Sequence, residues 1–177
     1  MDKASADIIW NQFGASIDML INIAMNCNDD YFSANRRFYY ILFHSAIFLD
    51  YYATIPPRDF VPQLSFTPAE TSVRPAEAID DLIPDKFYSS HEIVAYLKNT
   101  RNKCRTLVAL LAGETANLRF TEGNEAHDMD YSLHEIILYN MRHTQHHVAQ
   151  LNLLWRQDKN QHLEWSFRAG DIKGMGV

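Results

Sequence analysis

Residues 132–157 read SLHEIILYNMRHTQHHVAQLNLLWRQ, and their apolar side chains recur at the spacing of one helix face. Successive residues of a helix are about 100° apart, so His147 lies roughly 40° from His143. The apolar residues on this same side are Leu133, Ile136, Leu151 and Leu154. Both histidines are therefore expected to point into the apolar stripe of one long helix.

Two imidazoles four residues apart on one helical face can chelate a single metal ion. The residue after His143 is Thr144, so the glutamate that serves as general base in zinc peptidases is missing and peptidase chemistry is unsupported. The alternative is that both rings are core histidines, each hydrogen-bonded to another side chain. The pair alone leaves these two interpretations open.

His44 is the best candidate for a third ligand. It lies within residues 33–53, a predicted helix that is apolar nearly all round and therefore central in the fold. A histidine there is expected to be buried and to have a polar partner. Because this helix has no polar face, periodicity does not determine which way His44 points.

The remaining pattern predicts an all-α, four-helix bundle formed by one domain, residues 1–177. Its helices are expected at about 5–26, 33–53, 89–113 and 132–157. All six prolines fall between Thr54 and Tyr88, which predicts a long crossover connection between the second and third helices, with one short helical turn near 75–81.

Local signals refine these boundaries. Serine followed three residues later by glutamate, at Ser89 and Ser132, has the spacing of a capping box at a helix start. Gly113 is a plausible stop for the third helix. In the tail, 158–177, Trp165 and Phe167 predict packing on the helices, whereas residues 170–177 are expected to be loose. Four cations close together are interpreted as the solvated face of one helix: Lys98, Arg101, Lys103 and Arg105.

Composition bounds the function. The net charge of −6 argues against non-specific nucleic-acid binding, which needs a basic face. No long uncharged apolar run predicts a membrane span, and the first residues do not resemble a signal peptide, so a cytoplasmic location is expected. Cys27 and Cys104 stand far apart in no metal-binding pattern and are expected to be small core residues.

The order of elements and two segments resemble the DinB-like (YfiT-like) superfamily of metal-binding four-helix bundles. The segments are Phe43-His44-Ser45 and residues 143–151, HTQHHVAQL, which are similar to a histidine within helix 2 and to the family's H-x-x-H-H-x-x-Q-[LI] stretch. The resemblance covers about residues 5–157. One difference is Val148, where the family usually has arginine.

This resemblance implies a crossover bundle with one divalent metal ion held by His44, His143 and His147. Zn, Ni, Fe and Mn are not distinguished. Family members are similar to thiol-dependent transferases, such as bacillithiol S-transferases and mycothiol-dependent maleylpyruvate isomerase. The expected function is a metal-dependent enzyme, a thiol-dependent transferase, acting on an unidentified small molecule.

Two alternatives stay open: a non-catalytic bundle that binds a metal, ligand or partner, and a metal-dependent hydrolase. The hydrolase would need a general base, and no carboxylate is placed for that by the sequence. Asn140, Tyr40 and Tyr51 lie on the same helices as the histidines and could orient a ligand, although each is more simply an ordinary buried polar residue. A homodimer is compatible with the apolar helix faces.

The other five histidines rank lower as ligands. His146 is a candidate for a supporting residue or proton carrier near the metal. His127 lies in an acidic loop, and no role is expected for it. His91, His134 and His162 lie at helix starts or in the tail.

Overall fold

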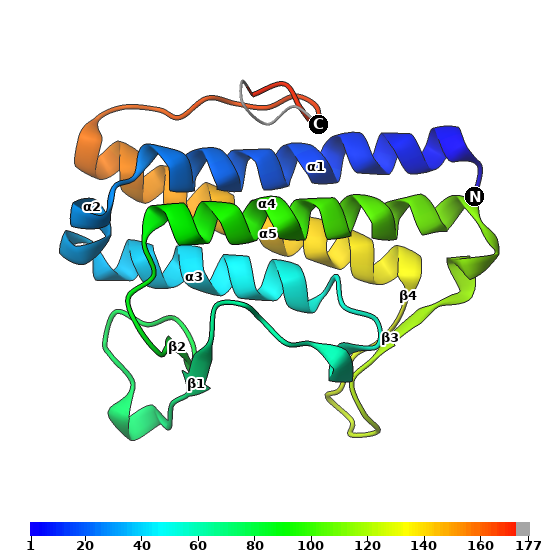
Figure 1. Ribbon diagram of the computed structural model, residues 1–177, viewed down its shortest axis with the longest axis horizontal. Helices are drawn as coiled ribbons and strands as arrows, with labels where there is room; N and C mark the ends of the chain where they lie inside the picture. The colour runs from blue at the N-terminus through cyan, green and yellow to red at the C-terminus, as the bar shows by residue number, and fades with distance from the viewer. Residues whose placement is uncertain (173–177) are drawn as a thin grey trace.

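The computed structural model describes residues 1–172, which form a mostly helical fold (Figure 1). Its long helices are α1 (Lys3–Asn26), α3 (Arg36–Tyr51), α4 (Ser90–Ala109) and α5 (Leu133–Lys159), and a short helix, α2 (Asp29–Ala34), precedes α3. Two hairpins that the sequence did not predict lie in the connections: β1 (Phe66–Pro68) with β2 (Leu82–Pro84), and β3 (Arg119–Thr121) with β4 (Asp130–Ser132). Single 3₁₀ turns occupy Pro57–Asp59, Thr71–Val73, Leu110–Ala112 and Glu114–Asn117.

The prediction of one helix over residues 33–53 was wrong at its start. Asn28 begins α2, because its side chain accepts a hydrogen bond from the Tyr31 amide at 2.8 Å. Asn35, with φ −119° and ψ 67°, then separates α2 from α3. The polar run around Asn28 was interpreted as a break, whereas an asparagine followed by two aspartates is a helix start.

The other helix boundaries are close to those expected. The Ser89–Glu92 capping box is present, and the Ser132 side chain accepts from the Glu135 amide. Helix α4 ends at Ala109, and a 3₁₀ turn continues it to Ala112, just before Gly113. The short helical turn expected near 75–81 is not a helix: this stretch holds one hydrogen-bonded turn, in which the Ala78 amide donates to the Pro75 carbonyl at 3.0 Å, and a 3₁₀ turn lies earlier, at Thr71–Val73.

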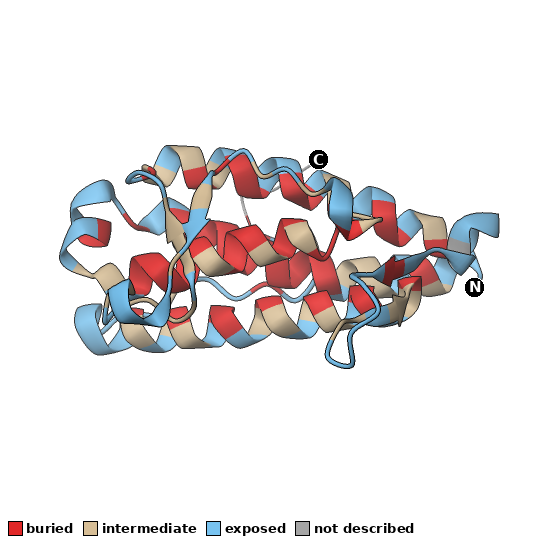
Figure 2. Cartoon of the chain, turned by 90° about the horizontal axis from the view of Figure 1, so that it is seen from below, coloured by how far each residue is buried: buried red, intermediate tan, exposed pale blue. Residues whose placement is uncertain are grey.

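The long helices enclose the core between them. Helix α1 packs against α4 and α5, and α3 packs against the same two helices. Buried residues line the sides of the helices that face one another (Figure 2). Helices α3 and α4 begin at the same end of the molecule, so residues 52–89 run back along the length of the helices (Figure 1).

This returning segment explains why α3 is apolar nearly all round. The Tyr88 amide donates to the Tyr39 hydroxyl at 2.9 Å, and the Tyr88 ring stacks on Phe43 with centroids 5.8 Å apart. Both Tyr39 and Phe43 are fully buried. The connection therefore covers the side of α3 that faces away from the other long helices, and α3 is central as the sequence predicted.

The tail does not pack through the residues that the sequence singled out. Trp165 is 59% exposed and Phe167 is 73% exposed, whereas Ser166 and Ile172 are buried. The tail runs along α1, where the Ala169 amide donates to the Asn11 carbonyl at 2.9 Å. This close approach needs Gly14, since a Cβ there would lie 2.5 Å from the Cβ of Ala169.

The expectation of a loose chain end was wrong for residues 170–172. The Gly170 amide donates to Asp18 at 2.7 Å, and Ile172 is 2% exposed. The rest of that expectation, residues 173–177, lies outside the described residues.

Two of the four cations on α4 pair with acidic side chains of other helices, and one of these two is buried. Arg101 is buried and forms a bidentate pair with the fully buried Asp18, at 2.5 and 3.1 Å. Lys103 contacts Asp50 at 2.5 Å, while Lys98 and Arg105 are exposed as predicted. The cations differ because Arg101 and Lys103 have acidic partners on α1 and α3, whereas Lys98 and Arg105 are exposed. The spacing of residues along α4 does not reveal these partners. Cys27 and Cys104 are both buried and free, as expected.

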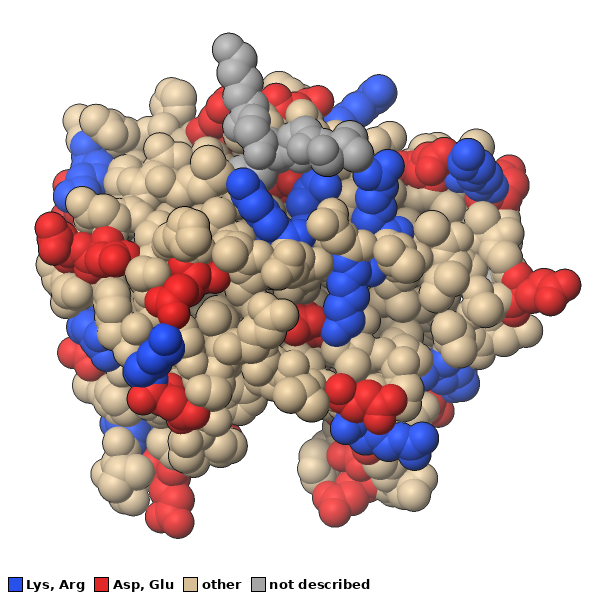
Figure 3. Space-filling view, in the orientation of Figure 1, with Lys and Arg blue, Asp and Glu red and all other residues tan. Residues whose placement is uncertain are grey.

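The surface carries charges of both signs, interspersed over the face that Figure 3 shows. A notch opens on one edge of this face, between the protruding β1–β2 segment and the β3–β4 hairpin (Figures 1 and 3). None of the helices within residues 1–172 has the length and apolar character that crossing a membrane requires.

Candidate metal centre

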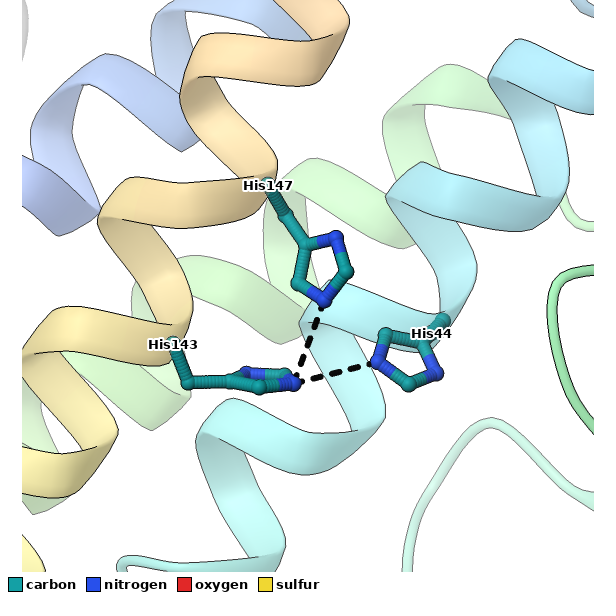
Figure 4. Close-up of side chains that lie close together, drawn as sticks. All are labelled: His44, His143 and His147. Atoms are coloured by element: carbon teal, nitrogen blue, oxygen red, sulfur yellow. Dashed lines mark hydrogen bonds between the residues drawn. The ribbon is translucent and has the colours of Figure 1, made fainter.

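The rings of His44, His143 and His147 meet between α3 and α5 (Figure 4). Nε2 of His143 lies 3.1 Å from Nε2 of His44 and 3.2 Å from Nε2 of His147. One nitrogen from each ring lies within 4.8 Å of the other two. The structure thus brings together the three histidines that the sequence selected, in an arrangement that could hold a metal ion.

Helix geometry and packing each supply part of this convergence. On α5, the four-residue spacing places the rings of His143 and His147 with centroids 4.5 Å apart. On α3, the His44 ring points toward α5 and lies 4.6 Å from the His147 ring, centroid to centroid. Phe48, one turn after His44, packs against His44 and His143 with centroids 4.5 and 5.6 Å away.

Hydrogen bonds at the far side of two rings fix their tautomers. Nδ1 of His44 contacts the Asp80 carboxylate, and Nδ1 of His147 lies 2.7 Å from the side-chain oxygen of Gln150. Because these oxygens accept, each Nδ1 must carry the hydrogen. In the neutral form of each ring, Nε2 then presents a lone pair to the centre of the cluster.

His143 differs from the other two. Its Nδ1 is buried and has no hydrogen-bond partner among residues 1–172. If its Nε2 carried the hydrogen, it could donate to only one of the two facing lone pairs at a time. A cation among the three Nε2 atoms satisfies all three lone pairs together, and this chemistry fits the residues present.

The distances suit such an ion. Zinc–imidazole bonds of about 2.0–2.1 Å in tetrahedral geometry place neighbouring nitrogens about 3.3 Å apart. The two Nε2 separations at His143, 3.1 and 3.2 Å, are close to that spacing. Three nitrogen ligands leave a fourth position open, which is the arrangement of catalytic rather than structural sites.

Burial keeps two of these rings neutral. Together with the smaller effect of the nearby histidines, it lowers the pKa of His143 to about 3 and that of His147 to about 4. Neutral imidazole is the form that binds metal, so protons compete weakly at this site.

A pH dependence of stability follows for the metal-free protein. The unfolded chain protonates these histidines below about pH 6.5, while the folded chain keeps them neutral until about pH 3 to 4. The free energy of unfolding in EDTA should therefore fall as the pH drops from 7 to 5, by roughly 2 kcal/mol for each histidine. Urea unfolding of the wild type and of the double variant His143→Gln/His147→Gln at both pH values measures this. An equally steep pH dependence in the double variant would contradict it.

Asp80 is the residue of this site that the sequence did not reveal. It lies in the proline-rich connection, where no periodicity marks a buried face, and 36 positions separate it from His44. Gln150 belonged to the motif that carried the family resemblance, but no role was assigned to it. The sequence marks Asp80 only as an acidic residue in a long irregular segment. Such residues are too common to identify this one as a partner of the site.

The polar residues proposed as ligand-orienting groups have structural partners instead. Asn140 donates to the Leu49 carbonyl at 2.9 Å, and the Tyr51 hydroxyl donates to Glu122 at 2.6 Å. Tyr40 accepts from Arg36 at 3.0 Å. Burial raises the pKa of Tyr51, and its hydrogen bond to Glu122 adds to this shift. These contacts agree with the simpler of the two interpretations given to these residues, that they are ordinary polar side chains rather than groups that orient a ligand.

The remaining histidines lie apart from the cluster, with one exception. His146 packs on His147 with ring centroids 5.0 Å apart, and it lines a separate cavity of about 670 Å³ that Met19 and Trp165 also border. His127 is exposed and forms a loose group with Glu125 and Asp128, both on the β3–β4 hairpin. His91 is exposed at the start of α4.

The fold and site define a mostly helical protein with a three-histidine cluster that could hold a metal. Comparison of the chain with models of protein families, with curated proteins and with solved structures gives no match. The resemblance to the DinB-like superfamily therefore stays a prediction from the sequence.

Proposed function

We propose that this protein binds one divalent metal ion through Nε2 of His44, His143 and His147, and that it is a thiol-dependent transferase of the DinB-like superfamily. The observation that carries the proposal is the meeting of three imidazole nitrogens, two of them held as lone-pair donors by Asp80 and Gln150. The sequence of long helices and the long return between α3 and α4 support the same family, whose fold is a four-helix bundle with a crossover.

A metal held by these residues supplies Lewis acidity, which lowers the pKa of a thiol or water in its free coordination position. The ligands would be imidazoles and no carboxylate, so the ion would retain much of its positive charge toward that position. The surrounding rings of Phe48, Tyr52 and Tyr139 make the α3–α5 side of the site apolar and limit competing water. Zn, Ni, Fe and Mn are all compatible with three imidazoles and an open position.

The position of Asp80 favours a transferase over a hydrolase. Hydrolysis needs a general base that can take a proton from water. Asp80 is the carboxylate in contact with the cluster, but its two oxygens are occupied by His44 and by the Leu82 amide. The ordinary pKa of a thiol is about 8.5 and that of water is about 15.7, so a thiol in the free coordination position would lose its proton without a base more easily than water would. The arrangement therefore suits a thiolate nucleophile.

Metal analysis of untagged protein, followed by a thiol-transfer assay, tests this function. We expect about one equivalent of divalent metal per chain. We also expect metal-dependent transfer of a small thiol, such as cysteine or dithiothreitol, to the electrophile 1-chloro-2,4-dinitrobenzene. Activity should disappear with EDTA and return with Zn²⁺ or Ni²⁺.

The other outcomes separate the alternatives. Metal-dependent cleavage of an activated ester without thiol transfer would replace the transferase by a hydrolase. Metal whose removal changes only thermal stability would indicate a non-catalytic metal protein. Protein that binds no divalent metal would overturn the proposal as a whole.

A further inference from the structure

The connection between α3 and α4 contributes a protruding element, which we call the crossover lobe and define as residues 66–84. Strand β1 pairs with β2 at its base, with Phe66 opposite Pro84 and Pro68 opposite Leu82. The lobe forms one side of the notch in Figure 3, and the β3–β4 hairpin forms the other. The lobe is thus a separate piece of structure that lies beside the site.

Asp80 joins the crossover lobe to the histidine cluster. One of its carboxylate oxygens contacts Nδ1 of His44, and the other accepts from the Leu82 amide at 3.0 Å, the first residue of β2. A single side chain therefore connects the base of the lobe to a ring whose other nitrogen faces the cluster. The Asp80 side chain is 22% exposed and that of His44 is 12% exposed, so little water competes for the contact.

The other two histidines have no comparable connection within residues 1–172. The partner of His147 is Gln150, on the same helix, and Nδ1 of His143 has no partner. Any change in the lobe that reaches the cluster through a ligand's hydrogen bond must therefore pass through Asp80 and His44.

The rest of the crossover lobe is lightly held. Its residues are exposed or half-buried, and Val73 is 72% exposed. The apolar side chains of the lobe that pack against the core are only partly buried, and they include Phe66, Ile79 and Leu82. Apolar burial is what gives a segment its resistance to local opening, so this lobe belongs to the less stable part of the fold. Beside these few apolar contacts, the part-buried contact between Asp80 and His44 is a main attachment of the lobe to the long helices.

We propose that Asp80 couples metal binding to closure of the crossover lobe over the site. This inference rests on the proposed function. A cation on Nε2 withdraws electrons from the ring, which strengthens the hydrogen bond from Nδ1 to the carboxylate. Coupling is reciprocal, so the factor by which the closed lobe raises metal affinity equals the factor by which metal favours the closed lobe.

Hydrogen exchange of the full chain, with Zn²⁺ and with EDTA, measures the coupling. In the wild type, Zn²⁺ should slow exchange of the amides of residues 66–84 by about 10- to 100-fold, the range in which outer hydrogen-bond partners change metal affinity. Asp80→Ala should lower Zn²⁺ affinity by a similar factor and should abolish the slowing. Asp80→Asn, which keeps an acceptor oxygen without the charge, should give intermediate values.

Asp81→Ala is the matched control. This neighbour is exposed, and its side chain makes no hydrogen bond to another residue of the described chain, so affinity and lobe exchange should equal those of the wild type. A merely structural role for Asp80 is distinguished by the visible spectrum of the Co²⁺-loaded protein. The spectrum should change in Asp80→Ala, move back toward wild type in Asp80→Asn and stay unchanged in Asp81→Ala.

The outcomes separate the coupling from the function on which it rests. Wild-type protein that binds no metal would defeat the proposed function. Wild-type protein that binds metal while lobe exchange is the same with Zn²⁺ and EDTA would defeat the coupling alone. The coupling alone would also be defeated if Asp80→Ala kept the Zn²⁺ affinity and the Co²⁺ spectrum of the wild type.

Discussion

Replacing His143 by leucine is expected to abolish stoichiometric metal binding and, at the same time, to stabilise the metal-free protein. The ring provides the Nε2 that lies within 3.2 Å of both other ligand nitrogens, so its loss leaves two ligands of three. Without metal, its buried Nδ1 has no partner within residues 1–172. A buried unsatisfied polar atom costs about 1–3 kcal/mol, and leucine removes that cost at similar volume.

Elemental analysis and urea unfolding in EDTA measure the two effects. The variant should carry close to no metal, and its free energy of unfolding should rise by about 1 kcal/mol or more. His147→Ala should also lose the metal. However, removing its hydrogen-bonded ring leaves a cavity, so no stabilisation is expected there. His91→Ala, at an exposed position on α4, is the control and should keep the metal content and the free energy of unfolding of the wild type. Full metal content in either ligand variant would refute the three-histidine site.

Replacing Asp18 by alanine is expected to destabilise the protein by about 3–5 kcal/mol, the usual cost of leaving one member of a buried ion pair without its partner. Asp18 is fully buried, accepts two hydrogen bonds from Arg101, and accepts a third from the Gly170 amide. The substitution therefore leaves a buried guanidinium unpaired and removes an attachment of the tail to α1.

Thermal unfolding and limited proteolysis provide the measurements. For a chain of this size, the loss corresponds to a decrease in Tm of roughly 6–20 °C, and cleavage within residues 160–172 should become faster. Asp130→Ala is the control, because Asp130 also pairs with an arginine, Arg119, but both side chains are more than half exposed. Its effect should stay below about 1 kcal/mol. A change in Tm for Asp18→Ala no larger than that of Asp130→Ala would contradict the buried pair.

The helices and two of the three histidines of the candidate metal centre could be predicted because both depend on local geometry. The i, i+4 spacing of His143 and His147 and the apolar stripe between them are properties of a single helix, and both survive in α5. The cap at Ser89 is likewise local, since a side chain and an amide three residues apart make it. Errors occurred where a polar run near Asn28 had two local interpretations, as a break or as a helix start.

Contacts between distant segments could not be predicted in this way. The sequence did not determine the orientation of His44, because a helix that is apolar on every side has no periodic pattern that marks its buried face. The orientation is set by the packing of α3 against α5 and by the connection that covers the other side of α3. Asp80 reaches His44 from a segment without periodicity. Arg101 was expected in solvent, yet 83 positions away Asp18 removes it from water.

The sequence by itself determined the helical class of this protein and the identity of three candidate ligands, since hydrophobic spacing and side-chain chemistry are encoded position by position. Only the tertiary structure decided that the three rings meet, which tautomer two of them hold, and that Asp80 ties one of them to the crossover lobe. The physical reason is that such contacts depend on how helices and connections pack, and packing is a property of the whole chain.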